Sequence, residues 1–283
     1  MAFIEVSDRV WVARHEWFDV NVTVVGGGAG LLVVDTHASA LAAEAVRDDV
    51  RRLSAQPVIG VVNTHEHFDH TFGNGVLGAG VPIYAHEIAA GRTVSAGERI
   101  KALYEDETDD PHRDEVLATE IVPAGRTFSS AMAVDLGDRM VELIHPGRGH
   151  TGGDIVVRVP DADVLLAGDL VEESALRSAV PGFGADCYPM EWPLTLDLVI
   201  SLMSPATVVV PGHGAPVDHD FVREQRSAIG VVAETIRDLA GRGIPVAQAL
   251  EAGDWPFPAE ELAHAVRRGY AHLPRTAKHL PLI

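Results

Sequence analysis

Four residues of one short segment carry side chains that bind metal ions in proteins. The segment 64–70 reads Thr-His-Glu-His-Phe-Asp-His and follows a continuous apolar run. Because side chains alternate along an extended chain, His65, His67 and Asp69 share one side, with His70 beside them as the chain turns. Imidazole nitrogens and carboxylate oxygens are ligands that zinc accepts, and three or four of them must converge. The segment therefore predicts part of a metal site.

Three further residues stand where an apolar run meets a turn. His150 lies in a glycine-rich loop, while Asp169 and His213 each end a run of apolar residues and glycine. The repeated arrangement places all three at one edge of a layered core, where binding sites are commonly built. We expect them to complete the metal cluster.

Hydrophobic patterning supplies the elements that position these residues. Apolar runs predict strands at 10–13, 20–25, 31–35, 57–62, 132–136, 140–144, 155–159, 164–167 and 207–210. Helical spacing predicts helices at 39–54, 86–103, 193–203, 219–240, 245–252 and 258–272. The acidic stretch 105–115 predicts a solvated loop.

Strands that alternate with helices predict an α/β fold whose sheets are covered by helices. The run 57–62 is apolar throughout, as in a strand that is buried on both faces. No linker or low-complexity segment divides the chain. We therefore expect a layered domain over residues 1–218 and a helical C-terminal extension, 219–283, packed on it.

Composition narrows the range of partners. The 283 residues include 22 Lys and Arg against 41 Asp and Glu, a net charge of −19, which disfavours nucleic acid and anionic membranes as partners. The single cysteine, Cys187, excludes cysteine-based zinc fingers and iron–sulfur clusters. The first residues lack the pattern of a signal peptide, so we expect a cytoplasmic protein that acts on a small molecule. The C-terminal helices either cover the active site or form a homodimer interface.

The ordered motifs resemble those of the metallo-β-lactamase superfamily over residues 20–214. The resemblance implies a four-layer αββα sandwich with two metal ions at its edge. Zinc is the expected metal, two ions per chain, with iron or manganese as alternatives. In the family pattern, the first ion is bound by His65, His67 and His150, the second by Asp69, His70 and His213, and Asp169 bridges them. This ligand set is similar to that of glyoxalase II.

The residues around the ligands resemble a different branch of the family, the cysteine-ligand di-zinc β-lactamases. The matching stretches are 145–151 and 210–214. Asp169, however, stands where those enzymes have a cysteine, and His70 adds a ligand that they lack. Glu172 occupies the position of the lysine that binds the carboxylate of the antibiotic, so we expect weak β-lactam hydrolysis or none.

The resemblance and the ligand chemistry together predict hydrolysis of a thioester, ester or lactone by a metal-bound hydroxide. A zinc-bound water has its pKa lowered from 15.7 to about 7. Asp69 is expected to act in catalysis by orienting this nucleophile and accepting its proton. The alternatives are a β-lactam hydrolase and a mononuclear iron enzyme of the persulfide dioxygenase kind, which would leave His70 and His213 idle.

The substrate pocket is predicted mainly from aromatic residues and from residues near the ligands. Trp17, Phe18 and Trp192 are candidates for hydrophobic lining. His145 lies five residues before His150, and Glu172 three residues after Asp169. We expect these five residues to line the pocket.

Overall fold

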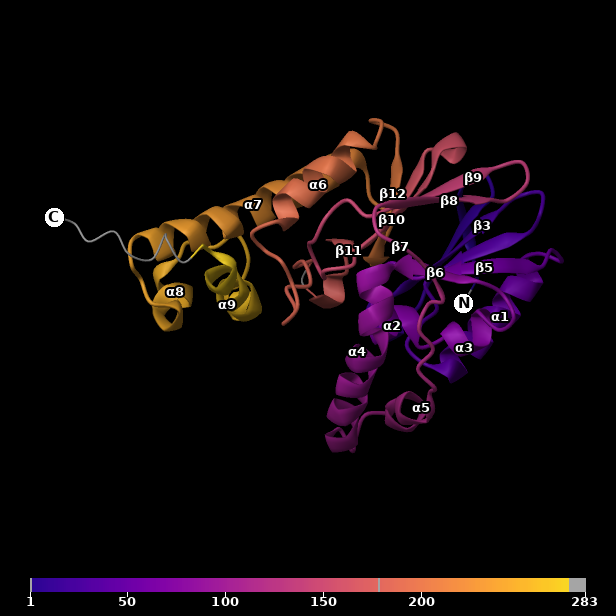
Figure 1. Ribbon diagram of the computed structural model, residues 1–283, viewed down its shortest axis with the longest axis horizontal. Helices are drawn as coiled ribbons and strands as arrows, with labels where there is room; N and C mark the ends of the chain where they lie inside the picture. The colour runs from indigo at the N-terminus through magenta and orange to yellow at the C-terminus, as the bar shows by residue number, and fades with distance from the viewer. Residues whose placement is uncertain (1, 178, 275–283) are drawn as a thin grey trace.

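The computed structural model describes residues 2–177 and 179–274 (Figure 1). Within these ranges no helix combines the length and the apolar character that crossing a membrane requires. The last nine residues of the predicted C-terminal extension, 275–283, lie outside the described residues.

Two sheets form the centre of the molecule, and they confirm the predicted α/β class. The first sheet holds strands in the order β1-β2-β3-β4-β5-β6-β7, and the second has the order β12-β11-β10-β9-β8. The strands of the first sheet are β1 (Ile4–Ser7), β2 (Val10–Arg14), β3 (Asn21–Gly26), β4 (Leu31–Val34), β5 (Val58–Val62), β6 (Ile83–His86) and β7 (Arg126–Phe128). Those of the second are β8 (Ala131–Asp135), β9 (Met140–Ile144), β10 (Val156–Val159), β11 (Val164–Glu172) and β12 (Val208–His213).

Alternation along the strands explains why the two sheets stack. In β4, Leu32 and Val34 pack between the sheets, while Leu31 and Val33 face the opposite side. In β11, Leu166 packs between the sheets and Leu165 faces outward. Because both faces of each sheet are apolar at these strands, each sheet needs a second covering layer.

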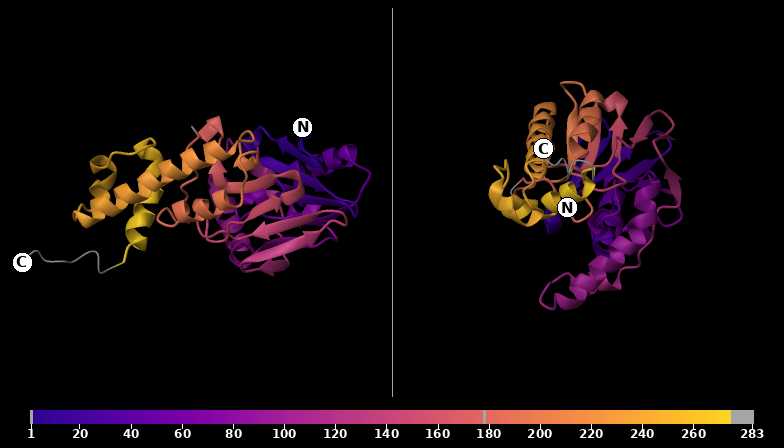
Figure 2. Two further views of the ribbon diagram at one scale, coloured as in Figure 1. Left: turned by 90° about the horizontal axis from the view of Figure 1, so that it is seen from above. Right: turned by 60° about the vertical axis from the view of Figure 1, so that its left-hand side comes forward.

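Helices supply that layer on both sides. The outer face of the first sheet packs against α1 (Ala40–Leu53) and α3 (Asn74–Leu77). The outer face of the second packs against α6 (Trp192–Ser201) and α7 (His219–Gly241). This order, helix–sheet–sheet–helix, is the predicted four-layer αββα sandwich (Figure 2).

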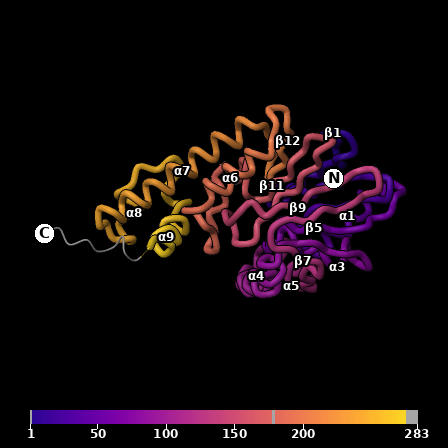
Figure 3. Tube along the Cα trace, turned by 45° about the horizontal axis from the view of Figure 1, so that its top comes forward, coloured from indigo at the N-terminus to yellow at the C-terminus, as the bar shows by residue number. Residues whose placement is uncertain are grey.

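Four further helices of the described chain lie outside these layers. In Figure 1, α4 (Glu87–Asp106) projects from the sandwich, with α5 (Arg113–Ala118) beside its far end. Beyond α7, α8 (Val246–Ala252) and α9 (Ala263–His272) fold back on it, as the tube in Figure 3 also shows. The predicted extension starts where α7 starts, but the division into two domains stays a prediction.

The structure corrects part of the sequence interpretation. The stretch 105–115 is not wholly a loop, because α4 continues to Asp106 and α5 begins at Arg113. Asp114 and Glu115 stand in the first turn of α5, where the helix dipole favours negative charge. Some of the acidic residues that suggested a solvated loop therefore belong to helices, and only the segment 107–112 connects them.

Candidate metal centre

The candidate ligands gather at one edge of the sandwich, where strands of both sheets end. The segment 65–70 follows β5 and opens the short helix α2 (Phe68–Thr71). His150 lies in the loop between β9 and β10, Asp169 in β11, and His213 at the end of β12. Because β11 and β12 are parallel neighbours, they bring Asp169 and His213 to the same edge.

The first cluster contains three histidines and one carboxylate. His67 Nδ1 lies 2.9 Å from His150 Nε2. Asp169 Oδ2 lies 3.4 Å from His150 Nε2 and 3.8 Å from His65 Nε2. One donor atom from each of the four residues falls within 4.8 Å of the others, as a single metal ion requires.

The second cluster is built by Asp69, His70 and His213. The Nε2 atoms of His70 and His213 are 3.3 Å apart. Asp69 Oδ2 lies 3.7 Å from His70 Nε2 and 3.4 Å from His213 Nε2. All three residues are buried, so their donor atoms converge away from bulk water.

Asp169 joins the two clusters. Its Oδ1 lies 3.2 Å from His70 Nε2 and its Oδ2 3.2 Å from His213 Nε2, in addition to the contacts with the first cluster. A glycine makes room for this carboxylate, since a Cβ on Gly212 would lie 1.9 Å from Asp169 Oδ1. The geometry brings together all seven residues that the sequence proposed as ligands.

Each candidate histidine ligand is held through its other ring nitrogen. His150 Nδ1 lies 2.7 Å from the carbonyl oxygen of Gly182, and His213 Nδ1 lies 2.7 Å from that of Phe18. A carbonyl oxygen only accepts, so in both rings Nδ1 carries the proton and Nε2 presents its lone pair to the cluster. His70 Nδ1 is held by Asp35 Oδ2 at 2.9 Å in the same way. Such bonds fix the orientation and tautomer of metal ligands.

The electrostatics of the clusters favour bound cations. Burial alone raises the pKa of Asp169, yet the neighbouring His213 and His70 hold that pKa well below its ordinary value. Burial lowers the pKa of His65 well below its ordinary value, so this imidazole is neutral. Its Nε2 atom is buried without a hydrogen-bond partner in the described part of the chain, which is costly unless it binds something else. The nitrogen-rich donor set with carboxylates suits zinc.

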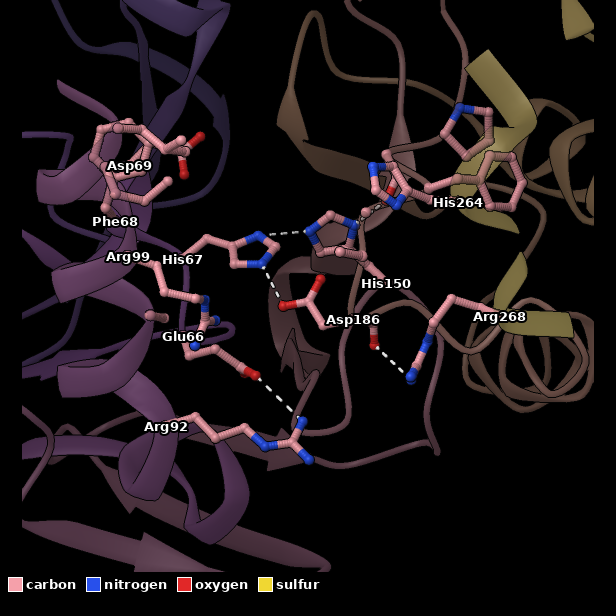
Figure 4. Close-up of a pocket in the computed structure, with 18 of the residues that line it drawn as sticks. Glu66, His67, Phe68, Asp69, Arg92, Arg99, His150, Asp186, His264 and Arg268 are labelled. Carbon is pink, nitrogen blue, oxygen red and sulfur yellow. Dashed lines mark hydrogen bonds and ion pairs between the residues drawn. The ribbon is translucent and has the colours of Figure 1, made fainter. Parts of the chain in front are cut away.

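A cavity of about 1230 Å³ opens onto the clusters. His67, Asp69 and His150 line its floor, α4 one wall, and the loop 180–188 with α9 the other wall (Figure 4). Pockets of roughly 300–1,000 Å³ already enclose drug-sized ligands, so a small-molecule substrate fits. The C-terminal helices thus contribute to the wall of the site.

Two predicted pocket residues are fully buried and do not face this cavity. Glu172 is 0% exposed, and its backbone bonds to the side chain of Gln225 on α7. Trp192 is also 0% exposed, with its indole nitrogen bonded to the carbonyl oxygen of Leu170. Both lie beside the candidate ligands instead: β11 extends to Glu172 and brings a carboxylate oxygen within 4.8 Å of donor atoms of Asp169 and His213, and the Trp192 ring lies 6.0 Å from that of His150. A role of these two residues in the pocket stays a prediction.

The other three predicted pocket residues are also not among the described residues that line the cavity. His145 stacks on His86 with ring centroids 4.1 Å apart. Trp17 stacks on His112 in the same manner, at 3.8 Å. Phe18 supports the centre through its backbone, because its carbonyl oxygen accepts the bond from His213.

Sequence reasoning missed two carboxylates that hold ligands. Asp186 Oδ2 lies 3.1 Å from His67 Nε2, and Asp35 accepts bonds from Thr64 as well as holding His70. Asp35 follows directly on β4, so its place at a strand end was a usable signal. Asp186 stands in a loop without strand or helix periodicity and gave none.

Comparisons with known proteins agree with this geometry. A family model described as "Metallo-beta-lactamase superfamily" matches residues 15–213. The "Metallo-beta-lactamase type 2" of Bacillus cereus is 26% identical over 225 residues, which cover 77% of this chain and 78% of that protein. The "Linear primary-alkylsulfatase" of Pseudomonas sp. (strain ATCC 19151) is 25% identical, and the match covers 85% of this chain but 53% of that protein. A solved metallo-beta-lactamase from Pontibacter korlensis has a TM-score of 0.65 at 24% identity, covering 81% of this chain and 98% of that one.

Proposed function

Because this chain belongs to the metallo-β-lactamase superfamily, we propose that it holds two zinc ions and hydrolyses a small ester, thioester or lactone. The chain is a metallo-hydrolase of this fold with buried His and Asp clusters. Our proposal concerns the number of metal ions, their identity and the class of substrate.

The observation that carries the proposal is the pair of clusters that share Asp169. Each cluster offers at least three donors, and the carboxylate of Asp169 contacts histidines of both. One ion would leave one group of buried donors without a cation. This supports two ions over the single iron of a persulfide dioxygenase-like enzyme, in which His70 and His213 would be idle.

Two bound zinc ions would polarise the scissile carbonyl and lower the pKa of a water molecule. The chain itself supplies the remaining functions. Asp69 lines the cavity and lies 3.4 Å from His213, so its carboxylate is placed to orient a water molecule and accept its proton. The bonds that hold His150 and His213 fix the ligands before substrate arrives. Oriented, buried donors avoid a reorganisation cost during reaction.

Hydrolysis of β-lactams is the second candidate, because the Bacillus cereus relative is named a metallo-beta-lactamase. Glu172 does not line the cavity and makes no direct contact with a substrate there, although a carboxylate oxygen of this residue lies within 4.8 Å of donor atoms of Asp169 and His213. Position 172 also offers no lysine that would attract the carboxylate of a β-lactam. We keep the ester, thioester or lactone as the proposed substrate.

The proposal also keeps a small-molecule substrate, a cytoplasmic setting, and no nucleic-acid or membrane partner. The net charge of −19 supports the exclusion of polyanions. The proposal includes a homodimer, in which the exposed faces of α7–α9 would form the interface.

Elemental analysis and a substrate screen test the proposal together. Protein purified without chelator should contain two zinc ions per chain and hydrolyse members of a panel of aryl esters, thioesters and lactones. The panel also includes a chromogenic cephalosporin and an alkyl sulfate, since one relative is named an alkylsulfatase. His70→Ala should lose one ion and the activity, whereas His219→Ala, outside both clusters, should lose neither. A single iron, or faster turnover of the cephalosporin than of every ester, thioester and lactone, would overturn the proposal.

A further inference from the structure

One face of α4 forms a wall of the cavity beside the metal centre. Arg92, Ala96, Arg99 and Leu103 all line the cavity. Their spacing of three and four residues places them on one helix face. In Figure 4, Arg92 and Arg99 stand on the same side as Glu66 and His67, opposite Arg268 of α9.

Contacts near both ends of this helix face fix the position of Arg99 relative to the ligand segment 65–70. Near the start of α4, Arg92 Nη1 lies 3.6 Å from Glu66 Oε1. Near its end, the Tyr104 ring lies 6.0 Å from the ring of Phe68. The helix thus runs alongside the ligand segment, and Arg99, about 10 Å along the axis from Arg92, lies beside it.

Arg99 is the arginine of this cavity without a partner among the described residues. Arg92 pairs with Glu66, and Arg268 donates to the carbonyl oxygens of Cys187 and Asp186. Within residues 2–177 and 179–274, the guanidinium of Arg99 makes no hydrogen bond or ion pair. A guanidinium presents a planar fork of N–H donors that matches a carboxylate or phosphate.

Apolar side chains line the same cavity as Arg99. Leu103 of α4 is 62% exposed and Leu176 from the opposite wall is 73% exposed, yet both line the same cavity. Val180 and Phe183 add apolar surface deeper on that wall. Large apolar side chains exposed together at a cavity indicate a binding surface for hydrocarbon.

We propose that Arg99 binds an anionic group of the substrate, and that Leu103 and Leu176 enclose the hydrocarbon between this group and the scissile carbonyl. The inference rests on the proposed hydrolase function and names its substrate class. That class is an ester or thioester with a carboxylate or similar anion several carbons from the bond that water cleaves. The cleaved bond is the one between the carbonyl carbon and the leaving oxygen or sulfur, and water supplies the new oxygen.

Glu260 and Glu261 on the opposite rim offer a competing role for Arg99. Both lie in η4 (Ala259–Leu262), which precedes α9. If Arg99 served to pair with them and narrow the cavity, its loss would affect every substrate alike. An anion-binding role affects anionic substrates alone, so the two roles predict different results.

The test compares matched substrates on zinc-loaded protein. Monoaryl esters of dicarboxylic acids with four, six and eight carbons are paired with aryl esters of the corresponding monocarboxylic acids. A further pair, the hexanoates of 4-hydroxybenzoate and phenol, places the anion on the leaving group. The variants are Arg99→Gln, Arg99→Lys as the charge-conserving change, and Glu98→Gln, whose residue does not line the cavity. Binding of adipate and of the uncharged hexanamide is measured separately by calorimetry.

We expect at least one anionic ester to be preferred over its neutral match, and Arg99→Gln to lower kcat/KM for it by about 10- to 100-fold, as for loss of a charged hydrogen bond. Neutral esters should change less than about twofold, Arg99→Lys should restore much of the preference, and Glu98→Gln should behave as wild type. Adipate, but not hexanamide, should bind more weakly to Arg99→Gln. Equal losses for both classes, or no Arg99-dependent preference in any pair, overturn the inference. If no ester is hydrolysed at all, the proposed function fails, while the adipate measurement still decides the role of Arg99.

Discussion

His67 Nε2 lies 3.1 Å from Asp186 Oδ2, although the two residues are 119 positions apart in the chain. The contact joins the ligand segment after β5 to the loop that forms the opposite wall of the cavity. Burial opposes ionisation of Asp186, but the bond with His67 lowers the pKa of that carboxyl below its ordinary value. Asp186 is therefore charged and orients His67 with Nδ1 toward His150.

Asp186→Ala should weaken metal binding at the first cluster without unfolding the protein. The variant leaves His67 Nε2 without its partner, and the ring loses its fixed orientation. Changes at residues that orient ligands typically reduce metal affinity or activity by about 10- to 100-fold. Competition with a chromophoric chelator measures the affinity, and Glu260→Ala, also at the cavity, is the control. Unchanged affinity in Asp186→Ala would show that the contact does not position His67.

Gly212→Ala should displace Asp169 and disrupt both clusters. An added Cβ would lie 1.9 Å from Asp169 Oδ1, and the buried carboxylate has no room to move while keeping its contacts. We expect metal content below two per chain and activity at least about 10-fold lower. Gly91→Ala on α4 is the matched control, since no atom lies within 4 Å of its added Cβ. Retention of both ions in Gly212→Ala would place Asp169 outside the centre.

Glu172→Lys should destabilise the protein and give no gain in β-lactam turnover. The side chain of Glu172 is buried, and its Oε1 accepts a bond from the backbone of Ser174 at 3.1 Å. Breaking a buried charged contact and burying an ammonium group costs roughly 3–5 kcal/mol. Chemical denaturation with Glu172→Gln as the isosteric comparison measures the loss. A stable Glu172→Lys with new cephalosporin turnover would contradict the buried position.

Titration of His37 should make the metal-free protein less stable in mild acid than at neutral pH. Burial lowers the pKa of His37 to about 3, and its Nδ1 accepts a bond from the backbone of Ala38 that protonation would break. The folded pKa lies below the unfolded value of ~6.5, so this stabilisation is complete above pH 6.5 and is lost as pH falls toward 3. The loss by pH 4.5 is on the order of 2 kcal/mol.

His37→Asn removes this titration and suits the backbone, since φ is 74° and asparagine tolerates the left-handed region. Urea unfolding in chelator at pH 7 and pH 4.5 compares the two proteins. The variant should lose less free energy of unfolding between these pH values than wild type. Identical losses would assign the acid sensitivity to other groups.

The fold class and the ligand positions were predictable because both depend on local sequence. Runs such as 57–62 are long enough to show a buried strand, and polar residues at the ends of such runs meet at one sheet edge. The spacing of His65, His67 and Asp69 was enough to predict that they share one side of the chain. β6 and β7 have only four and three residues, and α3 is a single turn. None of these elements is long enough to show a period in the sequence.

The pocket was less predictable because tertiary packing decides which way its residues face. The sequence indicated a strand that ends at 167, whereas β11 continues through Asp169 to Glu172 and buries the latter. The walls come instead from α4, the loop 180–188 and α9, which meet only in the folded chain. Arg99 gave no local signal, since an arginine in a charged helix is ordinarily solvated.

All candidate ligands precede residue 214, whereas η4 and α9, which complete the cavity wall, begin at Ala259. Part of the cavity wall is therefore built by a stretch of the chain that contributes no candidate ligand, in addition to α4 and the loop 180–188. Substitutions or whole-segment exchanges after α7 alter what enters the cavity without touching a histidine of the clusters. We therefore expect the C-terminal helices to tolerate changes that reshape this wall, provided that Arg268, which donates to the carbonyl oxygens of Cys187 and Asp186, is kept.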